Sequence, residues 1–557
     1  MKKEIFPTEV LEVEITELDH KGNGYARYVH APDRGSNGKG LKLFIPNAVP
    51  GDRVRVTVPN AKGRKQAVVP FDALLAASPD RNLDIPLKDA NAGGTPLISM
   101  TYPAQLAYKT QEVKDHLASQ GFDPACVRPI IGMDDPTRYR NKMELSFGAE
   151  GAIGMHEQGN FTKIIDMKDS VLAPKLFVRV KEVVADWQKD YQLSYYDKQT
   201  QKGLLRNLLL RQSFVTGELM VVIYATEAPS QMQEAVDDLS QRLSKRFDQL
   251  VSLQWMLHKE ATERIQADET FILHGRDYIN DELNGFRYRI WPETFFQANP
   301  VQAEKLVQLA LEFAQVNDQM RVLDLFCGVG TFSLPLAEKA KDLAGIEIVD
   351  QSIQSAIRNA IDNGLDNTFF MTSDARNGLK RLETEWGRPD LLLLDPPRSG
   401  AGGKVMRAIG RFGTDKIVYV SCFPNSLAED LVWLRDFGYE LVSVQPVDQF
   451  PHTTHVETVA LLSKLDIDQC IKVKLDMDEL DVTASESKAT YEEIKEYVMK
   501  KHGMKVSNRY ISQVKKKCGL EVGKNYNVSK KENPIAPNCP PEKEEAIKEA
   551  LKHFKMI

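Results

Sequence analysis

The stretch Arg321-Val-Leu-Asp-Leu-Phe-Cys-Gly-Val-Gly-Thr-Phe332 decides the fold of this chain. Its first half is an apolar strand, predicted over 321–326, and its glycine-rich second half opens a helix predicted over 331–340. The same order repeats at once, with a strand over 343–348 and a helix over 349–363. Alternating strands and helices indicate a parallel sheet covered by helices, in which ligands bind where the strands end.

The rest of the chain divides around this region. Three more short strands are predicted, over 368–373, 391–394 and 417–421. Upstream, period-2 alternation and turn residues predict a small all-β barrel, followed by a mixed α/β segment with cationic strand ends. Downstream, a tail rich in Lys and Glu predicts short helices. The predicted domains are a barrel over 1–70, a central α/β domain over 71–280, an α/β domain over 281–464 and a helical extension over 465–557.

The composition excludes collagen-like, mucin-like and wholly disordered chains. Of the 557 residues, 42% are hydrophobic and 27% are charged, which is typical of a globular chain, and the net charge of −6 does not itself predict a polyanionic partner. Because no apolar run is long enough to cross a bilayer and no apolar segment follows Met1-Lys2-Lys3, we expect a cytoplasmic protein. Scattered cysteines without a CxxC pair predict reduced thiols and no metal site.

The glycine loop predicts a nucleotide-like cofactor. Gly328 and Gly330 let the backbone approach a ligand closely, and Glu347, near the end of the next strand, can accept hydrogen bonds from ribose hydroxyls. A dinucleotide-binding motif has a third glycine at the position that Ser333 occupies in this chain. The carboxylate of Asp324 at the strand end instead suits a cationic, phosphate-free ligand such as S-adenosylmethionine, which we favour over a nicotinamide cofactor.

Two residues further along predict covalent chemistry on a pyrimidine. Cys422 follows the strand over 417–421 and precedes a helix, whose dipole is expected to lower the pKa of the thiol. Carbon 5 of uracil is a poor nucleophile, and addition of a thiolate to carbon 6 activates it. A base must then remove the carbon 5 proton. Glu457 is the candidate, with His452 and His455 as alternatives that we expect to be structural or to orient the nucleobase.

The loop Asp395-Pro-Pro-Arg398 argues against related chemistries. Methyltransferases that act on exocyclic amines place an aromatic residue where Arg398 stands, and cytosine-C5 enzymes often carry a cysteine in or beside this loop. Taken alone, Cys422 would be read as a core residue and Glu457 as a solvated carboxylate. Their combination predicts attack on a uracil that is flipped out of its stack or already single-stranded.

At these residues the sequence resembles the RNA uracil-C5 methyltransferase family, specifically its bacterial 23S ribosomal RNA branch. The four matching motifs are Glu293-Thr-Phe-Phe-Gln297-Ala-Asn299, Asp324 to Gly330, Asp395 to Gly400, and Ser421-Cys422 together with His455-Val-Glu457. They occur in the family's order and extend to the end of the catalytic domain near residue 464.

The resemblance implies a fold and a set of site residues. The fold is α/β, with a Rossmann-like class I methyltransferase domain and an N-terminal OB-like barrel that looks like a TRAM module. The mixed α/β central domain over 71–280 is assigned RNA binding, and a helical extension follows the catalytic domain. S-adenosylmethionine is implied as cofactor, and Cys422 and Glu457 are implied as nucleophile and proton acceptor. The implied cofactor contacts are Gln297, Phe326, Glu347 and Asp395, with Asp374 near the adenine.

The sequence departs from the family in three places. Many ribosomal RNA members carry a four-cysteine iron–sulfur site after the barrel, but the corresponding stretch 88–95 has no cysteine, so we predict no cluster. Phe423 replaces the usual Asn after the nucleophile and could stack on a base. The tail after residue 465 lies outside the shared catalytic core and looks like an extension seen in some Gram-positive members.

Alternative functions remain open from the sequence. The substrate could be transfer RNA rather than ribosomal RNA. The methyl acceptor could also be a cytosine, an amine or a small molecule. A non-catalytic RNA-binding or ribosome-assembly factor would use the barrel and the basic tail, and it would leave Cys422 and Glu457 without a role. We expect a monomer with RNA as its partner and no membrane association.

Overall fold

The computed structural model describes residues 8–29, 40–59, 65–85, 94–157, 160–259, 267–464, 491–518, 539–554 and 556. The chain forms two compact units, Met1–Asp466 and Ile467–Ile557. Within these described ranges, no helix is both long and apolar enough to span a bilayer. The stretch 88–95, for which we predict no iron–sulfur cluster, lies mostly outside these ranges, since residues 88–93 are not described.

The N-terminal region consists of two small sheets around one core. The first is antiparallel, with strand order β1-β5-β7, and the second has the order β2-β3-β4-β6. Their bounds are β1 Glu9–Glu14, β2 Glu17–Leu18, β3 Gly24–Tyr28, β4 Leu41–Ile45, β5 Arg53–Val58, β6 Gln66–Val68 and β7 Phe71–Ala76. Alternate residues such as Val54, Val56 and Val58 face a shared core, because successive side chains of a strand point to opposite faces. This confirms the predicted small all-β region.

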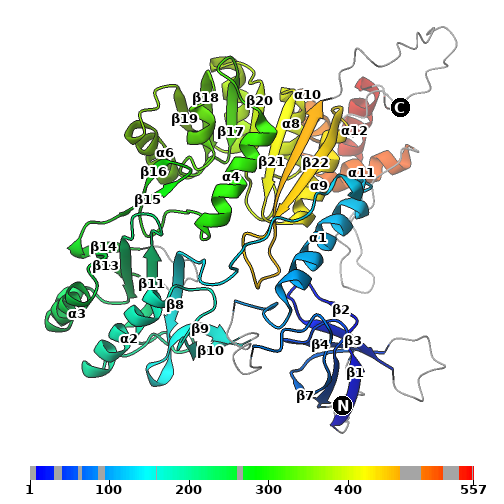
Figure 1. Ribbon diagram of the computed structural model, residues 1–557. Coiled ribbons are helices and arrows are strands. Elements are labelled where there is room, and N and C mark those ends of the chain that lie inside the picture. The colour runs from blue at the N-terminus through cyan, green and yellow to red at the C-terminus, as the bar shows by residue number, and fades with distance from the viewer. Residues whose placement is uncertain are drawn as a thin grey trace. The chain divides into compact units, whose positions relative to one another are not determined.

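The central region is a seven-stranded mixed sheet with helices on one face (Figure 1). Its strand order is β10-β9-β8-β11-β12-β13-β14, and β12 and β13 are its parallel pair. The helices α2 (Lys175–Asp190) and α3 (Gln233–Arg246) bury Trp187 and Leu239 against the sheet. The strands are β8 Lys142–Phe147, β9 Ile153–Glu157, β10 Asn160–Asp166, β11 Leu205–Gln212, β12 Leu219–Ala225, β13 Leu250–Leu257 and β14 Glu269–Gly275.

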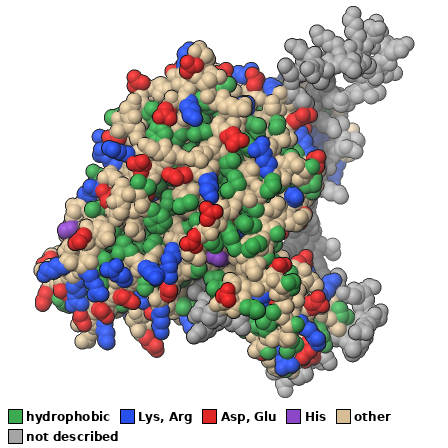
Figure 2. All heavy atoms as spheres, viewed as in Figure 1, with side chains coloured by type: hydrophobic (Ala, Val, Ile, Leu, Met, Phe, Trp, Pro, Cys, Tyr) green, Lys and Arg blue, Asp and Glu red, His purple; other side chains and the backbone are tan. Residues whose placement is uncertain are grey.

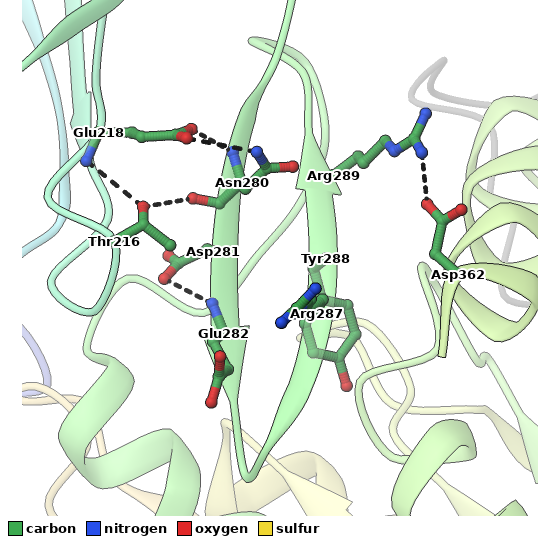
Figure 3. A pocket seen from close by; sticks show the side chains of 9 residues that line it. All are labelled: Thr216, Glu218, Asn280, Asp281, Glu282, Arg287, Tyr288, Arg289 and Asp362. Carbon is green, nitrogen blue, oxygen red and sulfur yellow. Dashed lines mark hydrogen bonds and ion pairs between the residues drawn. The ribbon is translucent and has the colours of Figure 1, made fainter. Parts of the chain in front are cut away.

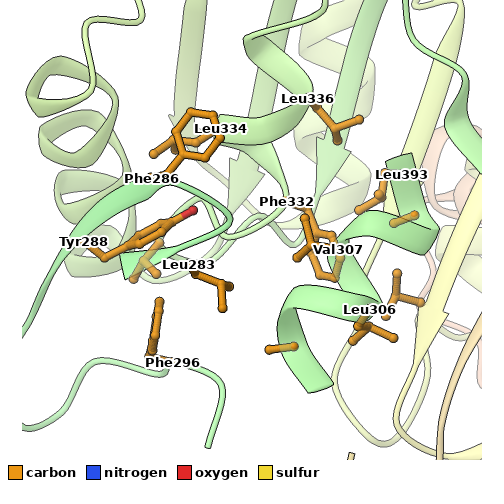
Figure 4. Packing of buried hydrophobic residues seen from close by; sticks show 14 of the residues in the cluster. Leu283, Phe286, Tyr288, Phe296, Leu306, Val307, Phe332, Leu334, Leu336 and Leu393 are labelled. Carbon is orange, nitrogen blue, oxygen red and sulfur yellow. The ribbon is translucent and has the colours of Figure 1, made fainter. Parts of the chain in front are cut away.

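A hairpin and one helix connect the central sheet to the catalytic sheet through a continuous core (Figure 4). The hairpin is β15 (Ile279–Leu283) with β16 (Phe286–Ile290), and the helix is α4 (Pro300–Ala314). Tyr288 and Phe296 pack ring against ring with centroids 5.3 Å apart. Phe332 and Leu393, which flank the motif loops of the catalytic sheet, belong to the same cluster. This packing therefore anchors the loops that carry the candidate site.

The catalytic sheet has seven strands in the order β19-β18-β17-β20-β21-β23-β22. Strands β17 to β21 run parallel, whereas β23 is antiparallel to β21 and β22. The strand bounds are β17 Arg321–Leu325, β18 Asp342–Glu347, β19 Thr368–Thr372, β20 Leu391–Leu394, β21 Lys416–Ser421, β22 Tyr439–Val447 and β23 Glu457–Lys464. The helices are α5 Ser333–Ala337, α6 Asp350–Asp362, α7 Ala375–Glu385, α8 Gly403–Phe412 and α9 Pro424–Arg435.

The observed elements confirm the predicted α/β alternation within one or two residues at most ends. The exception is α5, which is shorter than the helix expected over 331–340. Gly330 has a φ of 91°, so the glycine loop is still turning just before α5 begins. A further helix, α1 (Tyr102–Ser119), comes from the stretch before the central sheet and packs against α9 (Figure 1).

Over its described residues, 491–518, 539–554 and 556, the second unit forms three helices, and the Lys- and Glu-rich tail predicts short helices there. They are α10 (Tyr491–His502), α11 (Asn508–Lys517) and α12 (Pro541–His553). Ser507 caps α11 by accepting a hydrogen bond from the amide of Tyr510. A small core lies between the helices, formed by Ile494, Val498, Val506, Ile511, Val514, Cys539, Ala546, Ile547, Ala550 and Leu551.

Candidate active site

The parallel strands bring the predicted site residues to one edge of the catalytic sheet. Asp324 lies at the end of β17, Glu347 ends β18, and Asp395 directly follows β20. Cys422 directly follows β21, the next strand in the sheet. Since all four strands run in the same direction, their carboxyl ends meet at one edge, where ligands of such sheets bind.

The antiparallel strand β23 completes this edge with Glu457. Ser421, the last residue of β21, pairs with Thr458, and Thr458 Oγ1 donates to the carbonyl of Ser421 at 3.2 Å. Cys422 and Glu457, the first residue of β23, are the next residues beyond this pair, and the carboxyl of Glu457 is near enough to the thiol to raise its pKa. Residues directly opposite in an antiparallel pair project their side chains to the same face. The fold therefore brings the thiol and the carboxyl together, although they are far apart in the sequence.

The glycine loop forms a polar cradle around Asp324. Phe326 adopts a left-handed conformation with a φ of 71°, and the amides of Phe326 and Cys327 both donate to the carbonyl of Ile346. Ser333 Oγ donates to Asp324 Oδ2 at 2.5 Å. The other oxygen, Oδ1, is buried and has no hydrogen-bond partner among the described residues. A buried acceptor without a partner fits the ammonium group of a bound ligand.

Three carboxyl groups at this edge have raised pKa values. Burial raises the pKa of Asp324 to about 7. Desolvation, with the neighbouring Asp324, raises the pKa of Asp395 to about 7. Burial, with the neighbouring Asp395, raises the pKa of Glu457 to about 8. Adjacent carboxylates disfavour each other's ionisation, so a cationic ligand gains from each of them. The residues present therefore fit S-adenosylmethionine, which carries a sulfonium and an ammonium.

Hydrogen bonds hold two further predicted cofactor contacts in place. Glu347 accepts hydrogen bonds from the amides of Gly328, Ile348 and Val349 at 3.3, 2.8 and 3.0 Å. Gln297 is buried, and its side-chain oxygen accepts from Gln449 at 3.3 Å. These bonds fix the orientation of both side chains.

Asp374 has a more exposed setting than the other predicted contacts. It caps α7 by accepting from the amide and the side chain of Asn377, and the amide hydrogen bond lowers the pKa of its carboxyl. Its role near an adenine stays a prediction.

The thiol of Cys422 differs electrostatically from the sequence expectation. We expected the start of α9 to lower its pKa, but burial, together with the carboxyls of Glu457 and Asp395, raises it to about 12. Arg398 acts in the opposite direction and lowers it. The expectation was wrong because it counted the helix dipole and ignored the burial of the thiol and the two carboxyls near the sulfur. The resting thiol is therefore protonated at neutral pH.

The side chain after the nucleophile contributes a flat apolar surface beside the thiol. Phe423 is half-buried, and the guanidinium carbon of Arg398 lies 5.1 Å from the centre of its ring. This contact is a cation–π pair, which fixes the exposed Arg398 near Cys422. After burial, the positive charge of Arg398 is the largest influence that lowers the pKa of His455.

The two histidines are less suited than Glu457 to accept a proton. His452 is buried, has a left-handed φ of 67°, and its Nδ1 lies 3.1 Å from Gln105 Nε2. Burial lowers its pKa. Burial and then Arg398 lower the pKa of His455 to about 4, so this imidazole is a weak base. These observations agree with the expectation that both histidines are structural or orienting.

The loop between β22 and β23, residues 448–456, is held by α1 from outside the catalytic sheet. The Nζ of Lys109 lies 2.5 Å from Asp448 Oδ1, and both side chains are fully buried. Tyr102 donates to the other oxygen of Asp448 at 2.8 Å. The amide of His452 donates to Gln105 Oε1 at 2.9 Å. We call this set of contacts the α1 clamp, and it positions the loop that leads directly into Glu457.

Sequence reasoning missed the α1 clamp entirely. Lys109 and Asp448 are separated by 339 positions, and a lysine in a helix usually faces water. The only available signal was that Lys109 falls on the same face as Val113 and Leu117, four and eight positions on, which are buried. The sequence analysis considered Ser333 only as the position where a dinucleotide site would have a glycine. In the structure its hydroxyl donates to Asp324.

Replacing Lys109 with methionine is expected to impair both stability and turnover. Removing one partner of a buried ion pair leaves an uncompensated charge and costs about 3–5 kcal/mol of unfolding free energy. A displaced loop would misplace Glu457, and kcat should fall on the order of 10–100-fold. Chemical denaturation and steady-state kinetics measure the two effects.

The double variant Lys109→Met/Asp448→Asn separates these two effects. It removes both charges, so it should regain most of the stability while kcat stays low, because the cross-link to the loop is still absent. The exposed Lys189 in α2 supplies the control Lys189→Met. A Lys109→Met protein with normal kcat would show that the α1 clamp does not position Glu457.

A polar pocket of about 490 Å³ lies elsewhere, between the β15–β16 hairpin, the start of β12 and α6 (Figure 3). None of the predicted site residues lines it. Two contacts cross it: Arg289 binds Asp362 at 2.8 Å, and Glu218 accepts from the amide of Asn280 at 2.6 Å. These bonds join the central and catalytic sheets. Among the described residues, no group of three or more His, Cys, Asp or Glu side chains is arranged to hold a metal ion.

Comparison with known proteins identifies the family of this chain. A sequence model of the tRNA (uracil-5-)-methyltransferase family matches residues 101–465. An uncharacterized RNA methyltransferase of Halalkalibacterium halodurans is 36% identical over 460 residues, covering 82% of this chain and 97% of that protein. One from Clostridium tetani is 34% identical over 454 residues, covering 80% and 97%.

A solved structure shows the same architecture. The crystal structure of Pyrococcus abyssi tRNA (uracil-54, C5)-methyltransferase in complex with S-adenosyl-L-homocysteine superposes with a TM-score of 0.63. The two proteins are 25% identical, and the match covers 81% of this chain and 99% of the other. The chain therefore belongs to the tRNA (uracil-5-)-methyltransferase family, and it is an S-adenosylmethionine-dependent enzyme that methylates uracil in RNA.

Proposed function

We propose that this enzyme methylates carbon 5 of a uridine in 23S ribosomal RNA through a covalent adduct between Cys422 and carbon 6. The placement of Cys422 near Glu457 at the cofactor edge of the sheet carries the proposal. Gln297, Phe326, Glu347 and Asp395 are proposed to hold S-adenosylmethionine, which supplies the methyl group, with Asp374 near the adenine. The proposal includes a cytoplasmic monomer whose N-terminal barrel is a TRAM module.

The proposed reaction assigns one bond change to each step. The thiol of Cys422 loses its proton to solvent, and the thiolate bonds to carbon 6. The π electrons of the carbon 5–carbon 6 bond move toward oxygen 4, and carbon 5 then takes the methyl group from the sulfonium, which leaves as a neutral thioether. Glu457 removes the remaining carbon 5 proton. The freed electron pair re-forms the double bond and expels the thiolate.

The pKa values of the resting protein are consistent with this sequence of steps. A thiol with a pKa of about 12 is protected from solvent oxidants until substrate arrives. A cation bound beside Asp395 would offset one of the carboxylates that raise this pKa. The pKa of Glu457, about 8, is closer to neutral pH than that of His455, about 4, which suits a general base.

The choice between ribosomal and transfer RNA rests on different observations. The motif pattern of the sequence favours the ribosomal RNA branch. The similar structure from Pyrococcus abyssi is named as a transfer RNA uracil-54 enzyme, which favours the alternative. Mapping of 5-methyluridine in RNA from cells with and without this protein decides between them. Loss of the modification from 23S ribosomal RNA supports the proposal. Loss from transfer RNA would instead identify transfer RNA as the substrate. No change in either RNA would contradict the proposed function.

A further inference from the structure

The helical unit at the C-terminus buries its apolar residues in its own core and leaves a charged surface. Tyr497 of α10 stacks on His553 of α12 with ring centroids 4.5 Å apart. Four residues further along α10, Lys501 binds Glu549 of α12 at 2.6 Å. From the first contact to the second, the residue number rises along α10 and falls along α12, so the two helices are antiparallel. The end of α10 therefore lies toward the start of α12.

The turn after α10 and the end of α11 meet at that same place. Lys543, near the start of α12, donates to the carbonyl of Lys505 in the turn at 2.8 Å. Lys517 at the end of α11 binds Glu544 of α12 at 2.5 Å. These contacts gather several lysines at one end of the unit. We call this the basic end, formed by Lys500, Lys501, Lys505, Lys516 and Lys517.

The cations of this region outnumber the carboxylates available to them. Residues 491–518 and 539–554 together contain eleven Lys and Arg against seven Glu, in a chain whose net charge is −6. Three of those glutamates, Glu542, Glu544 and Glu545, lie at the start of α12. Glu549 is shared by Lys501 and His502, and Glu544 is shared by Lys517 and Lys548. The exposed side chains of Lys500, Lys505 and Lys516 form no ion pair within the described part of the chain. The basic end therefore keeps an uncompensated positive charge.

Helix-dipole compensation accounts for only part of this charge. A lysine in the last turn of a helix stabilises it by about 0.3–1 kcal/mol, which applies to Lys500 and Lys516. Lys505 lies between the helices and has no such role. Over the α2–α3 edge of the central sheet, by contrast, Lys and Arg alternate with Asp and Glu (Figure 2).

We propose that the basic end of the helical unit binds the phosphate backbone of the RNA substrate. This rests on the activity toward RNA and adds a second contact outside the catalytic sheet. Lysine–phosphate contacts release counterions, so they raise affinity in a salt-dependent way without reading sequence. The unit takes no part in the chemistry, and it increases the residence of RNA on the enzyme.

The test is charge reversal in the full chain. The variant Lys500→Glu/Lys505→Glu/Lys516→Glu removes the three unpaired lysines. Filter binding to a mixed-sequence RNA hairpin should show affinity lower by about tenfold to a hundredfold at 0.15 M salt. The slope of log K against log salt should fall by up to about three. The neutral variant Lys500→Gln/Lys505→Gln/Lys516→Gln should show a smaller loss of the same kind.

A matched control reverses the same number of charges elsewhere. Lys189→Glu/Lys339→Glu/Lys552→Glu changes three exposed lysines that lie outside the basic end. Equal affinity and equal slope in the test and control variants would overturn the proposal. At saturating RNA, the kcat of the test variant should equal that of the wild-type protein. A lower kcat would also contradict the proposal that the basic end acts only in binding. If the unchanged protein methylates no RNA, the proposed function fails separately, because hairpin binding is measured without turnover.

Discussion

Replacing Cys422 with alanine is expected to abolish methylation while RNA binding survives. The thiol is half-buried at the end of β21, near Glu457, and the proposed reaction begins with its attack on carbon 6. Without that adduct, carbon 5 is too weak a nucleophile to take a methyl group. Loss of a nucleophile typically lowers kcat by about 10⁴-fold or more. Transfer of labelled methyl groups to RNA measures the rate, and filter binding measures the retained affinity.

Cys126→Ala is the matched control for this variant. Cys126 is also partly buried, but it lies in the turn after α1 and belongs to the packing around α9. It should retain full activity. Turnover by Cys422→Ala within about tenfold of the unchanged protein would mean that the thiol forms no essential bond and that methyl transfer proceeds by direct attack.

Replacing Glu457 with glutamine is expected to stop the reaction after methyl transfer. The amide cannot accept the carbon 5 proton, so the double bond cannot re-form and Cys422 stays bonded to carbon 6. Multiple turnover should fall on the order of 10²–10⁴-fold. At the same time a methylated RNA–protein complex that resists denaturation should accumulate, visible as a shifted band on a denaturing gel.

Glu440→Gln is the control, since this exposed glutamate lies at the start of β22, at the edge of the sheet opposite the carboxyl ends that carry the site. It should turn over normally and leave no covalent complex. If Glu457→Gln accumulates no complex and keeps its turnover, another group removes the proton. His455 would then be tested next, although its pKa of about 4 makes it a weaker base.

The sequence predicted the parallel strands of the catalytic sheet well because most of them are short, apolar and buried, and because helices separate them regularly. The four apolar residues of β20, Leu391–Leu394, are followed at once by Asp395, and this pattern of a buried strand and then a polar residue recurs at Asp324 and Cys422. The carboxyl ends of parallel strands share one edge, so the grouping of these residues followed from strand direction alone.

The features that the sequence did not predict depend on contacts between distant segments. The antiparallel direction of β23, which brings Glu457 near Cys422, is fixed by pairing with both β21 and β22. The α1 clamp joins Lys109 to Asp448, and neither residue belongs to a motif. The raised pKa of Cys422 likewise arises from burial in the folded sheet and from the carboxyls of Glu457 and Asp395. Local rules such as the helix dipole act within a few residues and could not reveal these interactions.

The most direct test of the account is to locate the bond between enzyme and substrate. Substrate RNA containing 5-fluorouridine has no carbon 5 proton for Glu457 to remove, so the adduct should persist after methyl transfer. Digestion of the denatured complex and mass spectrometry should place a methylated fluoropyrimidine nucleotide on the peptide that contains Cys422. A fluorinated RNA that the enzyme binds but that leaves this peptide unmodified would contradict the covalent mechanism.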